Sequence, residues 1–154
     1  MVNIGLKKLY EKLKRVDYDE SEEILTEFCR YFHKHHMKSQ MEVKTFCMVS
    51  DWVDTSTKTL VIEFYEFDKN NFAKDAVNHL NSLGENELAA MINKGIHDYR
   101  NSQYSDMCDY PEEWVNDCIA IDRWIREHKK QLRQWLYNFL IENEDKIVSR
   151  GLIT

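Results

Sequence analysis

Glycine and proline are scarce in this chain, whose 154 residues include four glycines and a single proline. Both residue types interrupt helices, so their scarcity predicts long helices joined by short connections. No run of about 18 apolar residues occurs, and none of the segments is therefore expected to cross a membrane. The first residues, MVNIGLKKLYEKLKR, lack the continuous apolar core of a signal peptide and are interpreted as an amphipathic helix.

The sequence also lacks the short motifs that mark common enzyme sites. It contains no Gly-rich phosphate loop, no GxSxG and no HExxH. Cys118 and His128 would form a nucleophile–base pair only if the fold brought them together, and their spacing gives no support for this. Glu112 and Glu113 are adjacent, so on a helix their side chains diverge by about 100°. We predict no catalytic residues, and an enzyme with an unrecognised site is the least favoured hypothesis.

Paired metal-binding or disulfide-forming cysteines are absent as well. The four cysteines lie far apart, without a CxxC pair, at Cys29, Cys47, Cys108 and Cys118. This pattern is typical of free thiols in a reducing compartment, and we expect a cytoplasmic protein. His33 and His36 are three residues apart and could share a helical face, but no third ligand lies near them. A solvated helix end explains them better, so we predict neither a metal nor a cofactor.

Apolar residues recur at helical spacing along most of the chain, which is long enough for one core. The predicted helices cover about 3–16, a segment that begins after a cap at residue 17, 19 or 21 and ends in the run HKHHMK, about 40–53, the two arms of the stretch 72–99, 111–141 with a break near 128–130, and a last short piece, EDKIVSR. The sequence therefore predicts a single all-α domain, a bundle of six to eight helices. At its centre we place a helical hairpin, FAKDAVNHLNSLGENELAAMINKGIHDY, that turns at Gly84, where a glycine suits a positive φ.

The stretch TSTKTLVIEFYEF is the ambiguous one, because its β-branched and aromatic residues suit a strand. No second strand of similar quality exists to pair with it, and a lone strand leaves its backbone groups without partners. Thr55 or Ser56 would also cap a helix that presents Leu60, Phe64 and Phe67. We therefore favour a helix here.

Charge is distributed unevenly along the chain, whose net charge is −6. Residues 61–122 carry thirteen acidic and four basic side chains, a net of −9, whereas residues 1–60 balance and residues 123–154 carry +3. Carboxylates three or four residues apart on a helix lie about 5–6 Å from one another, near the spacing of successive phosphates along a nucleic-acid strand. The sequence predicts a partner-binding face formed by Asp106, Asp109, Glu112, Glu113 and Asp117. Further acids that could enlarge it are Glu63, Glu66, Glu85 and Glu87.

The expected partner is a basic or DNA-binding protein, steered toward this face by its field. Direct nucleic-acid binding is not expected, because the acidic region repels phosphate. The segment RWIREHKKQLRQW interleaves basic and tryptophan residues, but a solvated helix with packed tryptophans accounts for it better. The alternative is an interaction or structural module whose acidity only serves solubility. Nothing in the sequence indicates an oligomeric state.

The order of several segments resembles a bacterial family of uncharacterised domains that includes an acidic DNA-mimic protein. A helix like VKTFCMVSDWVD is followed by the aromatic EFYEF, then by FAKDAVNHLNSLGENELAAMINKGI and by a final helix ending in IENEDKIV. The resemblance covers residues 43–148, although the family's Asn-Gly-Gly-Phe turn is replaced by Asp54-Thr55-Ser56-Thr57. It implies an all-α fold and, for at least one member, binding to a DNA-binding transcription factor through an acidic face. It carries over no catalytic residues.

Overall fold

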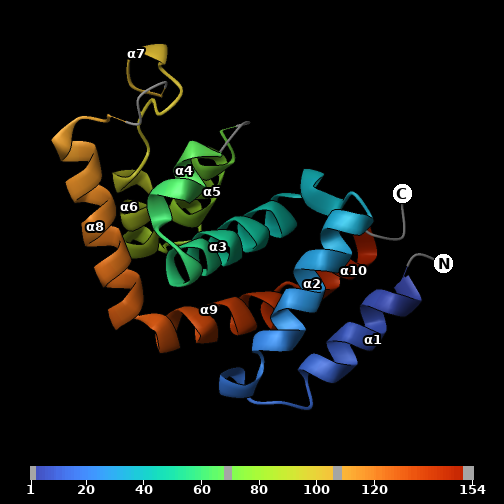
Figure 1. Cartoon of the computed structure of the whole chain (residues 1–154). Helices are drawn as coiled ribbons and strands as arrows, with labels where there is room; N and C mark the ends of the chain where they lie inside the picture. The colour runs from blue at the N-terminus through green and yellow to red at the C-terminus, as the bar shows by residue number, and fades with distance from the viewer. Residues whose placement is uncertain (1–2, 68–70, 106–108, 151–154) are drawn as a thin grey trace. The chain divides into compact units, whose positions relative to one another are not determined.

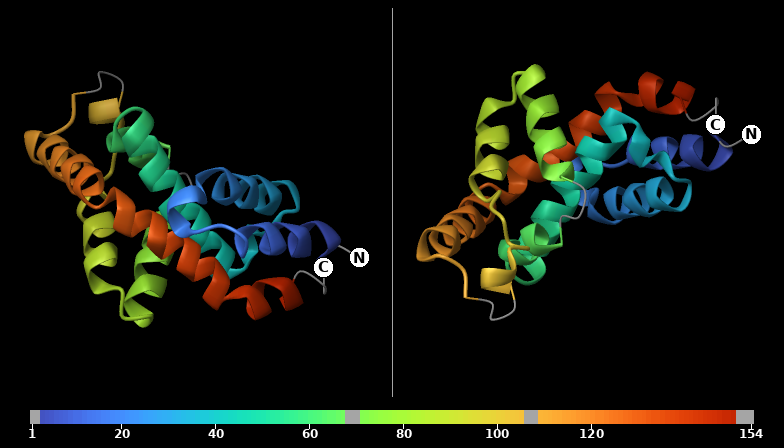
Figure 2. Two further views of the ribbon diagram at one scale, coloured as in Figure 1. Left: turned by 90° about the horizontal axis from the view of Figure 1, so that it is seen from below. Right: turned by 90° about the horizontal axis from the view of Figure 1, so that it is seen from above.

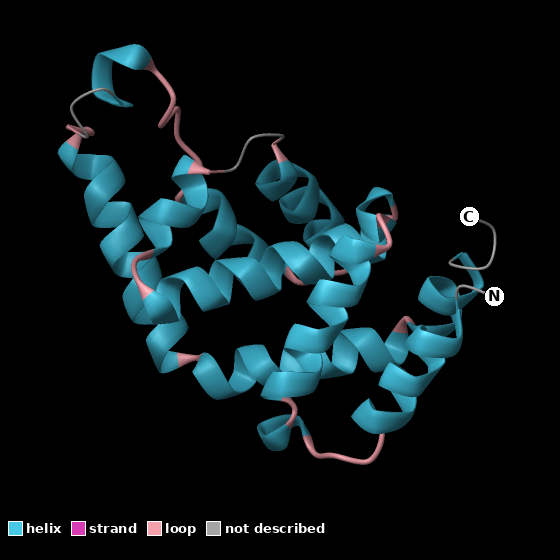
Figure 3. Ribbon diagram, turned by 45° about the vertical axis from the view of Figure 1, so that its right-hand side comes forward, coloured by secondary structure: helices cyan, strands magenta, loops and turns pink. Residues whose placement is uncertain are grey.

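The computed structural model describes residues 3–67, 71–105 and 109–150. Within these ranges every regular element is a helix, as Figure 3 shows. The described residues form eight α-helices of seven or more residues and two shorter ones, which Figure 1 labels. The predicted all-α fold is confirmed. No helix in the described ranges has both the length and the apolar character needed to span a membrane.

The described residues fall into two compact units, which are considered separately below. One comprises residues 1–50 and 129–154, and the other comprises residues 51–128. The first boundary lies inside α3 (Met41–Lys58), and the second lies between α8 and α9. The single domain expected from the chain length stays a prediction.

The first unit is built on aromatic packing. It contains α1 (Asn3–Leu13), α2 (Glu22–Lys34), the first half of α3, α9 (Lys129–Glu142) and α10 (Glu144–Arg150), with short 3₁₀ turns at Tyr18–Glu20 and Met37–Ser39. Figure 2 shows α1 beside both α2 and α10. The rings of Tyr10 and Phe28 meet edge to face at 4.9 Å, and those of Phe32 and Phe46 at 5.9 Å. The buried Tyr10 hydroxyl donates to the carbonyl of Leu140 on α9, which satisfies its polar group.

The second unit is organised around the predicted hairpin, which is confirmed. It contains the rest of α3, α4 (Val61–Glu66), α5 (Phe72–Ser82), α6 (Asn86–Lys94), α7 (Ser102–Ser105) and α8 (Glu112–Glu127). Figure 2 shows α5 and α6 side by side. The chain turns between them at Gly84, whose φ is 81°. Both helices bury small and apolar residues, which lets their backbones approach: Ala73, Ala76, Val77, Leu80, Leu88, Ala89 and Ile92.

The second hairpin helix is shorter than predicted, since α6 ends at Lys94 and not near Tyr99. A Cβ atom placed on Gly95 would lie 2.3 Å from the Tyr65 ring, so this ring packs directly on the glycine backbone. The buried Tyr99 lies in the non-helical segment that follows, where its hydroxyl donates to the carbonyl of Gly95 at 3.0 Å. Tyr65 and Gly95 are thirty positions apart in the chain. Helical periodicity describes only near neighbours, so it does not indicate this contact.

The ambiguous stretch is helical, as favoured, but its boundary differs from the prediction. Thr55 and Ser56 lie inside α3, which continues to Lys58, and they do not cap α4. The chain breaks instead at Leu60, whose backbone is extended. Asp122 of α8 accepts hydrogen bonds from both sides of this break, from the Ser56 hydroxyl at 2.7 Å and the Val61 N–H at 3.0 Å. The cap of α4 therefore comes from a distant carboxylate.

Three smaller outcomes concern helix ends and Trp52. The predicted break near 128–130 is confirmed, because α8 ends at Glu127 and α9 begins at Lys129. The first helix ends at Leu13, earlier than the predicted residue 16. Trp52 is fully buried, and its indole N–H donates to the Tyr65 hydroxyl at 2.9 Å.

Candidate functional site

The predicted acidic face centres on the amino end of α8. Asp109 precedes this helix and Glu112 and Glu113 form its first turn, and all three side chains are exposed. The negative carboxylates face the positive end of the helix dipole, which favours their position. Asp106 lies outside the described residues. The structure thus brings three of the five predicted residues together on an exposed helix end.

Asp117 stands apart from those three, because its carboxylate is bound within the unit. One oxygen lies 3.1 Å from Nε2 of His97, and the other lies 3.6 Å from the Lys94 ammonium. The His97 ring stacks on Trp114 with an interplanar angle of 3° and a centroid distance of 5.0 Å. Asp117 therefore fixes the segment after α6 against α8, and the row predicted from the spacing of Glu113 and Asp117 does not continue as free carboxylates.

An aromatic cluster supports the amino end of α8. The ring of Trp114 contacts those of Tyr99 and Tyr104, each with a centroid distance of 5.3 Å, and stacks near Tyr110 at 6.1 Å. The Tyr110 hydroxyl donates to a carboxylate oxygen of Glu66 at 2.8 Å. Residues 100–110 lie between the helices predicted from the sequence, whose periodicity does not indicate this cluster. The three tyrosines at positions 99, 104 and 110 are the signal that could have indicated an anchored segment.

Two apolar side chains are exposed on α8 next to the acids. Val115 is 36% exposed and Ile119 is 51% exposed. Glu112, Val115 and Ile119 are spaced i, i+3 and i+7, so they lie on one face of the helix. We call Asp109, Glu112, Glu113, Val115 and Ile119 the α8 surface. It combines negative charge with exposed apolar area.

The four other acids considered for this face do not all extend it. Lys94 at the carboxyl end of α6 pairs with Asp117 of α8. Glu85 and Glu87 lie at the opposite end of this nine-residue helix, so at 1.5 Å per residue they are roughly 10 Å from Lys94 along the helix axis. Glu66 lies beside the surface through its bond to Tyr110, and Glu63 accepts a hydrogen bond from Thr59 at 2.8 Å. Negative charge is thus divided between two regions of the unit.

The two units have net charges of opposite sign. Residues 51–128 carry sixteen acidic and seven basic side chains, a net of −9, whereas the first unit carries +3. The field around the second unit is therefore negative, and it attracts cationic groups from beyond contact distance.

Nucleophilic chemistry at Cys118 has no support in the geometry. Its sulfur lies 3.3 Å from the Tyr99 hydroxyl, and burial raises the pKa of the thiol to about 11. The thiol therefore stays protonated near neutral pH, whereas the thiolate is the reactive form. His128 is directed elsewhere, with Nδ1 2.8 Å from the carbonyl of Trp124 and its ring stacked on that indole.

The histidines considered as metal ligands do not form a site. α2 ends at Lys34, and His36 has a φ of 54°, so His33 and His36 do not share a helical face. Both side chains are exposed. Among the described residues, no group of three or more His, Cys, Asp or Glu side chains has a geometry that could hold a metal ion.

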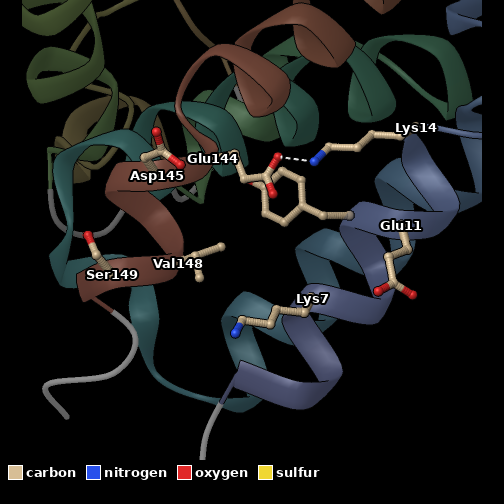
Figure 4. Close-up of a pocket in the computed structure, with 8 residues that line it drawn as sticks. Lys7, Glu11, Lys14, Glu144, Asp145, Val148 and Ser149 are labelled. Atoms are coloured by element: carbon tan, nitrogen blue, oxygen red, sulfur yellow. Dashed lines mark ion pairs between the residues drawn. The ribbon is translucent and has the colours of Figure 1, made fainter.

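Each unit contains a hollow that could admit a small molecule. In the first unit, a hollow of about 600 Å³ lies between α1 and α10, and Figure 4 shows the side chains around it. Lys14 and Glu144 form an ion pair of 2.6 Å there. The remaining charged lining residues are one lysine and two acids, so the charges largely cancel: Lys7, Glu11 and Asp145. The second unit has a hollow of about 540 Å³, whose charged lining residues are Lys74, Asp98 and Arg100.

Comparison of the chain with family models, with curated proteins and with solved structures finds no match in any of the three. The resemblance to the family that includes a DNA mimic stays a prediction.

Proposed function

We propose that this protein is a non-enzymatic binding domain whose α8 surface binds a basic partner protein. The observation that carries the proposal is the presence of exposed Val115 and Ile119 beside the exposed carboxylates Asp109, Glu112 and Glu113. Charge gives an interface its orientation and association rate, and apolar contact at its centre contributes affinity. The α8 surface offers both within about two helical turns.

Acidity that serves only solubility is the main alternative, and it accounts for the carboxylates alone. Acidic residues in the first turn of a helix stabilise it by about 0.3–1 kcal/mol each through the helix dipole. The helix dipole does not stabilise the exposed, uncharged side chains of Val115 and Ile119. A binding surface explains the two sets of residues together, and we therefore favour it.

The partner class that we propose is a nucleic-acid-binding protein, which this domain would hold away from its nucleic acid. Carboxylates on neighbouring turns of a helix have a spacing close to that of phosphates, and a phosphate-binding surface is rich in lysine and arginine. The net charge of −9 on the second unit would steer such a surface toward it, more strongly at low salt than at high salt. The proposed mechanism is competition, with no chemical step.

The test is affinity capture from native cell extract with two matched triple variants. The first, Asp109→Asn/Glu112→Gln/Glu113→Gln, neutralises the carboxylates of the α8 surface. The control, Glu85→Gln/Glu87→Gln/Glu127→Gln, removes the same charge from exposed positions outside it. We expect the first variant to lose the captured partner and the control to keep it. Equal retention by both variants would refute the proposal, and equal loss would assign binding to net charge alone.

A second experiment separates DNA mimicry from other protein binding. Duplex DNA is added to the captured complex at fixed ionic strength. Release of the partner would support competition for a nucleic-acid-binding surface. Retention would leave a protein-binding domain but refute mimicry. A Val115→Ser/Ile119→Ser variant should weaken the captured complex at high salt more than at low salt, because the apolar contact is not screened.

A further inference from the structure

The hollow of the second unit has a positively charged lining inside an otherwise acidic unit. Its volume is about 540 Å³, and the residues that line it come from the ends of α4, α5 and α6 and from the segment that follows α6. The charged and titratable side chains among them are Lys74, Arg100, His97 and Asp98. Two fixed cations thus face one carboxylate, whereas the unit as a whole has a net charge of −9.

Both cations of the hollow lie outside the ion pairs that join described residues. Within the described part of the chain, Lys74 and Arg100 form no ion pair, and both side chains are exposed. Lys94, by contrast, is bound to Asp117. Lys74 and Arg100 are therefore available to a ligand, and arginine in particular binds phosphate through paired N–H donors.

Other features of the hollow also suit an anion that carries hydrogen-bonding groups. Asn71 and Lys74 lie at the amino end of α5, which is the positive end of the helix dipole. The side-chain amides of Asn71 and Asn93 provide both donors and acceptors, which are the groups that bind hydroxyls. The volume falls within the range of roughly 300–1,000 Å³ that is usual for sites of small organic ligands.

We propose that this hollow is a binding site for a small phosphomonoester of the size of a sugar phosphate or mononucleotide. Lys74 and Arg100 bind the phosphate group, and the amides of Asn71 and Asn93 bind hydroxyls on the rest of the molecule. His97 forms part of the wall, where Asp117 holds its ring by Nε2 at 3.1 Å. The site is separate from the α8 surface, and the proposal does not depend on partner binding.

Isothermal titration calorimetry with the full chain tests the proposal with four probes. They are ribose 5-phosphate, adenosine 5′-monophosphate, inorganic phosphate and the uncharged adenosine. We expect saturable binding of at least one of the two phosphomonoesters, weaker binding of inorganic phosphate and none of adenosine. Binding of adenosine as tight as that of its monophosphate would overturn the proposal, and so would the absence of saturable binding of both phosphomonoesters up to about 10 mM.

Paired variants assign the binding to this hollow. Lys74→Gln/Arg100→Gln is expected to weaken the phosphomonoester at least about tenfold, because two charge-assisted contacts are lost. Lys58→Gln/Arg123→Gln removes the same charge from exposed positions of the same unit that do not line the hollow, and it should bind within about twofold of the unaltered protein. Equal weakening by the two variants would overturn the proposal, because it would show a general effect of charge. All four positions are exposed, so circular dichroism should show unchanged helix content.

Discussion

The backbone N–H of Val61, at the start of α4, donates a hydrogen bond of 3.0 Å to Oδ1 of Asp122 on α8. The same oxygen accepts from the Ser56 hydroxyl near the end of α3, at 2.7 Å. One carboxylate oxygen of α8 thus joins the end of α3 to the start of α4, from residues that are 66 and 61 positions away in the chain. It replaces the side-chain cap that α4 lacks within its own segment.

Replacing Asp122 should destabilise the second unit. Asp122→Ala removes the acceptor for an N-terminal N–H of α4 and for a hydroxyl, and we expect the free energy of unfolding to fall by about 1–3 kcal/mol. Asp122→Asn keeps an acceptor oxygen and should cost less than half as much. Urea unfolding followed by circular dichroism measures both. An alanine variant as stable as the unaltered protein would contradict this role.

The two glycines of the hairpin region should respond differently to alanine. At Gly95 an added Cβ would lie 2.3 Å from the Tyr65 ring, so Gly95→Ala must displace that ring at a cost of about 1–3 kcal/mol. A Cβ added at Gly84 would meet no described atom within 4 Å beyond its chain neighbours, and Gly84→Ala should cost only about 1 kcal/mol through its φ of 81°. Thermal or urea unfolding compares the two. The prediction fails if Gly84→Ala is the more damaging change.

Tyr65 links two buried polar groups, and removing its hydroxyl should be costly. The hydroxyl accepts from the Trp52 indole at 2.9 Å and donates to the carbonyl of Ile92 at 2.7 Å. Tyr65→Phe leaves the buried indole N–H without this acceptor, and we expect a loss of about 1–3 kcal/mol in unfolding free energy. Trp52→Phe combined with Tyr65→Phe removes both partners of one bond and should cost less than the sum of the single changes. Strict additivity would contradict the coupling.

Alkaline pH should destabilise the second unit through Cys118. Burial raises the pKa of this thiol to about 11, so between pH 9 and 11 the folded state keeps a proton that the unfolded state has lost. The free energy of unfolding therefore falls as pH rises through this window. We expect a decrease of about 1–2 kcal/mol between pH 8 and pH 10.5. Cys118→Ser has no thiol to titrate and should show a smaller decline. Urea unfolding of both proteins at pH 8 and pH 10.5 measures the two decreases. Equal decreases for the unaltered protein and for Cys118→Ser would contradict the prediction.

The same burial should protect Cys118 from alkylation. In the native protein near pH 8, iodoacetamide should modify the half-buried Cys29 before the buried Cys118, because reaction requires an accessible thiolate. In urea the difference should disappear. Peptide mass spectrometry over a time course measures the two rates, and early modification of Cys118 under native conditions would be inconsistent with its position in the structure.

Local sequence patterns were sufficient for most of the helices. Apolar periodicity located the hairpin, the turn at Gly84 and the break between α8 and α9, because each depends on residues within a few positions of one another. The helical state of α4 was also predicted, by the absence of a pairing strand. The ends of α3 and α6 were not, because Asp122 and Tyr65 determine them from positions distant in sequence.

The amino-acid sequence by itself determined the all-α fold, the central hairpin and the concentration of negative charge, since helical period and residue charge are properties of the chain. Only the tertiary structure decided which carboxylates remain free. Asp117 is bound by His97 and Lys94, and Asp122 caps α4, whereas Glu112 and Glu113 stay exposed beside Val115 and Ile119. All four acids carry the same charge in the sequence. Their different surroundings arise from packing between distant segments, and a helical wheel of α8 alone contains no information about those partners.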